Sequence, residues 1–122
     1  MNAVNDALRT VLKKYAELDM FSDCEIVSPE SRGPDGDTPF HIAAYDGDID
    51  SAKTMLPYIA DINFQGDIGN TPLHYAVLSN KPEMARFLIQ HGADIAKGND
   101  YGDTPIDFME GKEAFRDFGV SR

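Results

Sequence analysis

A run of alternating aspartates is the stretch of this chain whose spacing comes closest to a site for chemistry. Asp46-x-Asp48-x-Asp50 imitates the first half of an EF-hand calcium loop, in which oxygen ligands recur at every second position. The imitation stops there, because the sixth position is Ser51 rather than glycine and the twelfth is Pro57 rather than glutamate. The sequence also holds no glycine-rich phosphate loop, no HExxH and no paired CxxC. We therefore predict that the chain is not an enzyme and binds no metal or cofactor.

Two of the three histidines occupy equivalent places in a repeated six-residue signal. The signal reads Thr-Pro-Phe-His-Ile-Ala at 38–43, Thr-Pro-Leu-His-Tyr-Ala at 71–76 and Thr-Pro-Ile-Asp-Phe-Met at 104–109, a constant interval of 33 residues. A second marker keeps the same interval, since Ala-Asp-Ile at 60–62 recurs at 93–95. A fixed period of this size predicts stacked structural repeats. His41 and His74 are thus expected to serve the fold.

The residue types in each copy of the signal predict the start of a helix. The threonine can act as an N-cap, accepting a hydrogen bond from a free backbone N–H, and the proline after it suits the first helical position. Inside the second copy, Leu73, Ala76 and Val77 fall at i, i+3 and i+4 and form one apolar face. Each copy therefore predicts a short amphipathic helix.

The repeated signal resembles the ankyrin repeat over residues 33–122. The resemblance implies an all-α solenoid of stacked helix-turn-helix units with β-hairpin or turn fingers, in which His41 and His74 bond to the backbone of the adjacent repeat turn. We expect a single domain over 1–122. Its predicted parts are an N-terminal helical cap with an inserted loop (1–32), two full repeats (33–65 and 66–98) and a truncated third repeat that serves as the C-terminal cap (99–122).

Three segments depart from a regular repeat. Apolar residues at a 3.6-residue spacing predict a helix over 2–19 that covers the first repeat. Residues 28–34 are composed like a loop and lengthen the approach to the first repeat. Pro57 lies inside the predicted second helix of the first repeat, and proline removes a hydrogen bond from a helix interior. We expect that helix to end or distort near Leu56.

Composition excludes several classes of partner. The net charge of −10 opposes binding to nucleic acid phosphates or to anionic membrane surfaces, both of which need a basic protein surface. No run of 18 apolar residues predicts a membrane span. Cys24 is the single cysteine, which excludes an internal disulfide and fits the reducing cytoplasm. We expect the protein to be a monomer when it is free.

The resemblance implies that a protein partner meets the finger tips and the exposed face of the first helices, which together form a concave groove. Carried over one unit at a time, the predicted partner-binding residues are Asp35, Asp37, Tyr45, Asp46, Asp48, Asp67, Ile68, Asn70, Leu78, Ser79, Asn80, Asp100, Tyr101, Asp103 and Lys112. About half of the aspartates in this set are expected to be turn formers, because aspartate bonds its own backbone in turns. The remaining charges and the apolar residues between them predict a basic protein partner.

Two functions remain open on this sequence. A short, acidic ankyrin protein is similar to bacterial immunity proteins, so the more specific hypothesis is an inhibitor whose acidic groove neutralises a basic, nuclease-like toxin domain. The alternative is a general adaptor or regulatory subunit that recognises a peptide or a protein. Salt dependence separates the two, because a charge-driven complex weakens as salt rises.

Overall fold

Helices account for the regular structure of the residues that the computed structural model describes, 3–18 and 28–118, and these residues form no β-strand. The α-helices are α1 (Ala3–Ala16), α2 (Pro39–Asp46), α3 (Ile49–Met55), α4 (Pro72–Leu78), α5 (Pro82–Gln90) and α6 (Pro105–Met109). Three single turns of 3₁₀-helix add η2 (Leu56–Tyr58), η3 (Asp67–Gly69) and η4 (Glu113–Phe115). The segment 19–27, which includes Cys24, lies outside the described residues.

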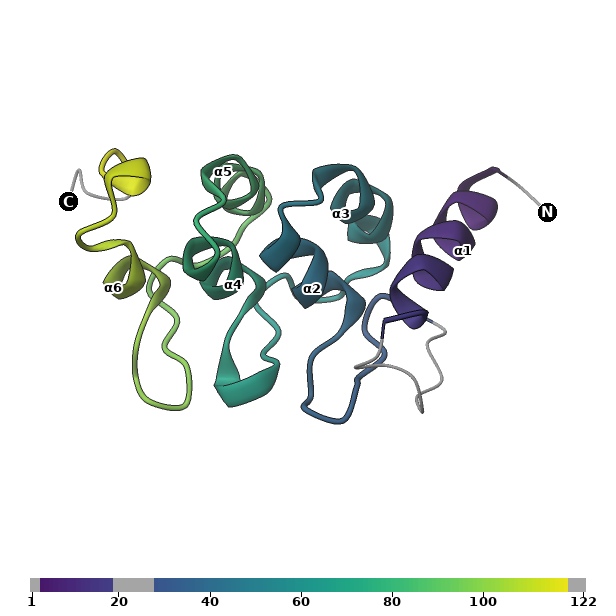
Figure 1. The fold of residues 1–122 in the computed structure, drawn as a ribbon, viewed down its shortest axis with the longest axis horizontal. Helices are drawn as coiled ribbons and strands as arrows, with labels where there is room; N and C mark the ends of the chain where they lie inside the picture. Colours follow the sequence, from purple (N-terminus) through teal and green to yellow (C-terminus); the bar gives the residue numbers. More distant parts are fainter. Residues whose placement is uncertain (1–2, 19–27, 119–122) are drawn as a thin grey trace.

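The helices form two rows, and the turns between them point away from both (Figure 1). The first row holds α2, α4 and α6 side by side, and the second holds α3, α5 and η4. Three turns project beyond the first row, and we call them finger 1 (33–37), finger 2 (66–70) and finger 3 (99–103). This arrangement confirms the all-α stack of helix pairs predicted from the 33-residue interval, with fingers that are turns rather than strands.

Each helix of the first row begins at a capping box. The Thr38 side chain accepts a hydrogen bond from the backbone N–H of His41, and the His41 ring accepts one in return from the backbone N–H of Thr38. Thr71 with His74 and Thr104 with Asp107 repeat this exchange, and a proline follows each threonine at the first helical position. Two otherwise unpaired backbone donors are satisfied in each box, so the predicted helix starts are confirmed.

The fingers close by one hydrogen-bond pattern repeated at the same interval. The backbone N–H of the first finger residue donates to the carbonyl of the last, over 2.7, 2.8 and 2.8 Å in fingers 1 to 3. The fourth residue of each finger is a glycine at positive φ, a conformation that glycine adopts without a Cβ clash. These are Gly36, Gly69 and Gly102. The period in the sequence is thus a period in backbone geometry.

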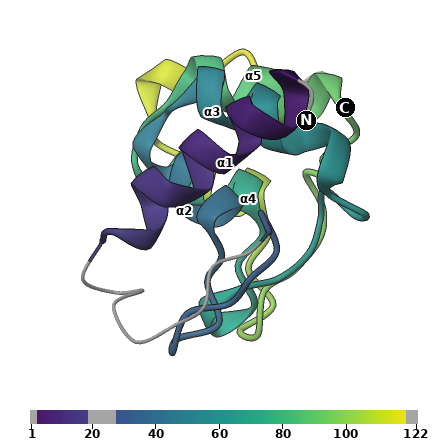
Figure 2. The ribbon, with the colours of Figure 1, turned by 90° about the vertical axis from the view of Figure 1, so that its right-hand side faces the viewer.

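The core lies between the two rows and beneath α1. Phe40 and Leu73 occupy equivalent positions in α2 and α4 and have no exposed surface. Ile106, their equivalent in α6, is half-buried, because no further first-row helix packs on α6 in the described part of the chain. At the other end, α1 lies across α3 and α2 and buries Leu12 and Tyr15 (Figure 2). The predicted helix that covers the first repeat is therefore confirmed.

Pro57 shapes the end of α3 as predicted. The α-helix stops at Met55, and the chain continues as the 3₁₀ turn Leu56–Tyr58 with proline inside it. In the second helix pair the equivalent helix, α5, has no internal proline and runs for nine residues against the seven of α3. The difference in length follows from the missing N–H and the ring clash of proline.

Candidate functional site

A donor side chain at the base of each of the first two fingers ties that finger to the next. Arg32 donates from Nη1 to the carbonyl of Gly36 in its own finger and, over 2.8 Å, to the carbonyl of Gln65. Gln65 repeats the pattern 33 residues later, donating to the carbonyls of Gly69 at 2.8 Å and Gly98 at 3.2 Å. The third equivalent position is Gly98 itself, which has no side chain to continue the series. The three fingers are thereby joined in one row.

Asp37 was predicted to contact a partner, and the structure shows an internal role for it. Its side chain lies inside the stack, with 7% of the residue exposed. Oδ1 accepts hydrogen bonds from the backbone N–H of Asp67 at 2.9 Å and from the hydroxyl of Tyr75 at 2.7 Å. Burial, together with the hydrogen bond to this carboxylate, raises the pKa of Tyr75. Asp37 therefore holds finger 2 and α4.

Asn70, another predicted contact residue, occupies the position of Asp37 one unit later and is also buried. It is 6% exposed, and its Oδ1 accepts a hydrogen bond of 2.9 Å from Nδ2 of Asn99 in finger 3. The third equivalent residue, Asp103, is exposed, because the described residues contain no further finger for it to bond. The same repeat position is thus internal twice and external once.

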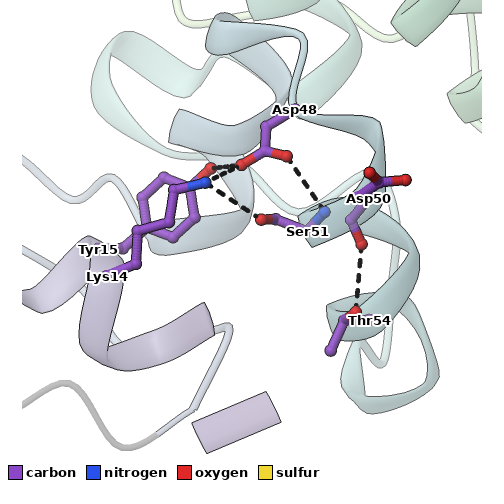
Figure 3. Close-up of polar contacts among 6 residues, drawn as sticks. All are labelled: Lys14, Tyr15, Asp48, Asp50, Ser51 and Thr54. Carbon is purple, nitrogen blue, oxygen red and sulfur yellow. Dashed lines mark hydrogen bonds and ion pairs between the residues drawn. The ribbon is translucent and has the colours of Figure 1, made fainter. Parts of the chain in front are cut away.

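Asp48 was also predicted to face a partner, and in the structure it is half-buried and joins α1 to the first helix pair (Figure 3). Its Oδ2 accepts hydrogen bonds from Lys14 Nζ and, at 2.8 Å, from the hydroxyl of Tyr15, while Oδ1 caps α3 by accepting from Ser51 N at 3.2 Å. Burial alone would raise the pKa of Asp48, but the hydrogen bonds from Lys14, Ser51 and Tyr15 hold that pKa well below its usual range. Burial and this carboxylate raise the pKa of Tyr15.

Six of the predicted residues remain exposed or half-exposed on the fingers, and we call them the finger face. They are Asp35, Asp67, Ile68, Asp100, Tyr101 and Asp103. Partial burial and the neighbouring carboxylates of Asp37 and Asp35 raise the pKa of Asp67, so the negative charges on this face repel one another. Ile68 is 41% exposed and Tyr101 is 76% exposed. The finger face therefore combines four carboxylates with two apolar side chains.

The remaining predicted residues lie at the ends of the first-row helices. Tyr45 and Leu78 are exposed, at 48% and 43%, and Asp46 and Asn80 are exposed beside them in the chain. Ser79 is half-buried and donates from Oγ to the carbonyl of Tyr75 at 2.9 Å. Lys112 is half-buried between α6 and η4, where it lines a cavity of about 340 Å³ with side chains that include Ile106 and Phe115. These residues therefore lie outside the three fingers.

Sequence reasoning missed three residues that position the fingers: Arg32, Gln65 and Tyr75. Arg32 and Gln65 are long donor side chains one repeat interval apart, and that spacing could have identified them as residues with the same role. Tyr75 shares its repeat position with Ile42 and Phe108, so it alone brings a hydroxyl to that place. The Tyr75 ring also meets the exposed Tyr45 ring edge-on, with centroids 6.2 Å apart.

The histidines serve the fold. Nδ1 of His41 accepts from Thr38, and Nε2 donates to the carbonyl of Phe64 at 3.0 Å, which fixes the neutral tautomer with the proton on Nε2. Burial lowers the pKa of His41 to about 4. His74 repeats the arrangement, with Nε2 donating to the carbonyl of Asp103 at 2.8 Å. Both bonds reach the backbone of a neighbouring turn, as the resemblance implied.

The described part of the chain offers neither a metal-binding cluster nor a membrane-spanning helix. Its histidine, cysteine, aspartate and glutamate side chains form no group of three or more with the spacing to hold a metal ion. None of its helices combines the length and the apolar character needed to cross a membrane.

Comparison with known proteins agrees with this geometry. A family model described as ankyrin repeats in three copies matches residues 1–105. The match includes the N-terminal helix, which lies before the motifs that carry the resemblance in the sequence. No curated protein is similar enough to match the chain. Because the family model covers most of its length, the chain belongs to the ankyrin-repeat family, whose repeats are in general a non-catalytic module for binding other proteins.

Proposed function

We propose that the chain binds a basic protein through the finger face. The observation that carries the proposal is the sign of the charge there: four exposed or half-exposed carboxylates and, within the three fingers, no lysine or arginine. The nearest cation in the sequence is Arg32, whose guanidinium already bonds two backbone carbonyls. A partner that brings lysine or arginine side chains would meet no competing cation from the fingers.

Electrostatic repulsion within the face supports this choice of partner. The raised pKa of Asp67 reflects partial burial and the nearby carboxylates of Asp37 and Asp35. A cation placed among these groups relieves that repulsion, which adds to the attraction between the two proteins. Charges of this kind contribute mainly to the association rate and to orientation, and salt screens them.

The more specific form of the proposal is an inhibitor or immunity protein for a basic, nuclease-like toxin domain, acting in the cytoplasm as a monomer. Such a domain has a cationic cleft for nucleic acid phosphates, and a row of carboxylates on tied fingers would occupy the cleft in their place. The acidic finger face and the single cysteine in the sequence support it. A partner held by uncharged contacts would count against the inhibitor role and would indicate a general adaptor.

A capture experiment with two matched variants tests the proposal. The tagged wild-type chain is incubated with lysate from the organism that makes it, and the captured protein is identified by mass, purified and titrated at low and high salt. The finger variant changes Asp35, Asp67, Asp100 and Asp103 to asparagine. The control variant makes the same change in net charge at exposed carboxylates outside the fingers: Asp50→Asn, Glu83→Gln, Glu110→Gln and Asp117→Asn.

We expect a basic protein whose affinity falls as salt rises. The finger variant should bind at least about tenfold more weakly than the control variant at low salt, and the gap should narrow at high salt because screening removes the charge contribution. Inhibition of a nuclease activity of that protein at one-to-one stoichiometry would support the inhibitor role. Equal binding by both variants, or a neutral partner held regardless of salt, would refute the proposed charge mechanism.

A further inference from the structure

Ile68, at the tip of finger 2, is held in a backbone conformation that its side chain disfavours. Its φ is 59° and its ψ is 19°, in the left-handed region. A β-branched residue rarely adopts this conformation, because its Cβ crowds the neighbouring backbone, whereas glycine and asparagine tolerate it. Asn80 is the other non-glycine residue at positive φ in the described chain. Ile68 is therefore the one β-branched residue held this way among the described positions.

The hydrogen bonds between fingers explain why the backbone at position 68 is left-handed. They do not explain why the residue there is isoleucine. Between fingers 1 and 2, the backbone N–H of Asp67 is satisfied by the Asp37 side chain. Between fingers 2 and 3, Asn70 is engaged by Asn99, and the N–H of Asp100 donates instead to the carbonyl of Ile68 at 2.9 Å. The left-handed conformation at position 68 orients that carbonyl towards the N–H of Asp100. Glycine or asparagine would aim it as well and would avoid the strain of a branched side chain.

Packing of the Ile68 side chain inside the fold does not explain the choice of isoleucine either. It is 41% exposed, and the tip of finger 2 projects away from both helix rows (Figure 1). Strain that the fold does not require is commonly found at functional sites. An exposed apolar side chain on a strained backbone, within a face of carboxylates, fits a contact that is completed by another molecule.

We propose that Ile68 is the apolar anchor of the finger face, with Tyr101 of the next finger as its neighbour, and that both pack against an apolar group of the bound protein. This inference rests on the proposed function, and it specifies the partner further. Carboxylates of Asp67 and Asp100 precede the two apolar residues in the chain, so the complementary surface is an apolar side chain flanked by lysine or arginine. The hydrogen bonds between the fingers hold the backbone that presents this pair, which lowers the cost of ordering on binding.

The first test concerns stability and needs no partner. Ile68→Asn keeps the left-handed turn with a residue suited to it, whereas Leu78→Asn replaces a similarly exposed aliphatic residue on the regular helix α4. We expect the urea midpoint of Ile68→Asn to equal or exceed that of the wild type, because relief of strain offsets the lost apolar contact. The midpoint of Leu78→Asn should fall. A fall for Ile68→Asn as large as that for Leu78→Asn would overturn the strain argument and the inference.

The second test measures binding to the protein captured by the wild-type chain. Ile68→Asn should weaken binding by about tenfold or more at both low and high salt, because an apolar contact is not screened. Ile68→Val keeps an apolar side chain and should stay within about threefold of the wild type. Wild-type affinity for Ile68→Asn would overturn this inference and leave the proposed function standing.

The two proposals fail in different ways. Loss of binding by Ile68→Asn, together with wild-type binding by the four-aspartate finger variant, would overturn the charge mechanism and support the anchor. Capture of no protein by the wild-type chain would overturn both.

Discussion

The hydrogen bond between Tyr15 and Asp48 should add measurably to the attachment of α1 to the stack. Asp48 makes three contacts at once, to Lys14, to Tyr15 and to the backbone of Ser51. Replacing it with alanine removes an N-cap, which costs about 1 kcal/mol. It also leaves the hydroxyl of Tyr15, a residue only 1% exposed, without its acceptor, at a cost of about 1–3 kcal/mol. The ion pair adds about 0–1 kcal/mol, because Lys14 is exposed.

We therefore expect Asp48→Ala to lower the free energy of unfolding by about 3.5 kcal/mol, the middle of these summed contributions. Tyr15→Phe removes the hydroxyl alone and leaves Asp48 bonded to Lys14 and Ser51, so it should cost about 1 kcal/mol. In the Asp48→Ala background, Tyr15→Phe should cost nothing or restore about 0.5 kcal/mol, because it removes the hydroxyl that has lost its acceptor. The coupling energy should be about 1.5 kcal/mol, as for a hydrogen bond to a charged acceptor.

Urea unfolding followed by circular dichroism supplies the four free energies of this cycle. Asp50→Ala is the matched control, because Asp50 is an exposed aspartate in the first turn of the same helix. It should change the free energy of unfolding by no more than about 0.5 kcal/mol. A coupling energy near zero between positions 15 and 48 would refute the reasoning, whatever the single variants cost.

Three further predictions concern the fingers and the pH dependence of folding. Because burial lowers the pKa of His41 to about 4 from 6.5, its contribution to stability is fully present above about pH 6.5 and is lost as the pH falls towards 4, by about 3 kcal/mol in total. Urea midpoints that stay flat across this window would contradict it. Gly69→Ala should destabilise the chain by about 1–2 kcal/mol more than Gly102→Ala, since a Cβ at 69 lies 2.7 Å from the backbone N of Asp100, whereas one at 102 meets nothing within 4 Å. Thermal unfolding compares the two, and equal losses would refute the clash. Gln65→Ala should speed amide hydrogen exchange in finger 3, because it removes a hydrogen bond that ties this finger, and unchanged exchange there would count against that role.

The helix starts were predictable because their causes are local. Threonine at the N-cap and proline after it act within one turn, and Pro57 ends α3 through its own missing N–H. Because these local signals recur every 33 residues, they also predicted a stack of repeats. The structure and the family match both confirm that stack. The long donors Arg32 and Gln65 followed the same interval, so their roles could also have been read from it.

The roles of the aspartates were harder to predict because their causes are not local. Asp35 and Asp37 lie two residues apart in one finger, yet the first is exposed and the second is buried against finger 2. Asp48 finds its partners in Lys14 and Tyr15, more than 30 residues earlier in the chain. Which carboxylate faces solvent depends on how the units stack, and nothing in the residue type records that.

The direction of the hydrogen bonds between neighbouring units has a consequence for how the protein is made. Arg32, Asp37, His41, Gln65 and His74 each place a side chain on backbone that comes later in the sequence. On a ribosome, where the N-terminal part emerges first, the groups that receive each finger are therefore already present when that finger appears. The units can therefore fold in the order of their synthesis, because the side chains that bind the backbone of a later unit belong to the unit made before it.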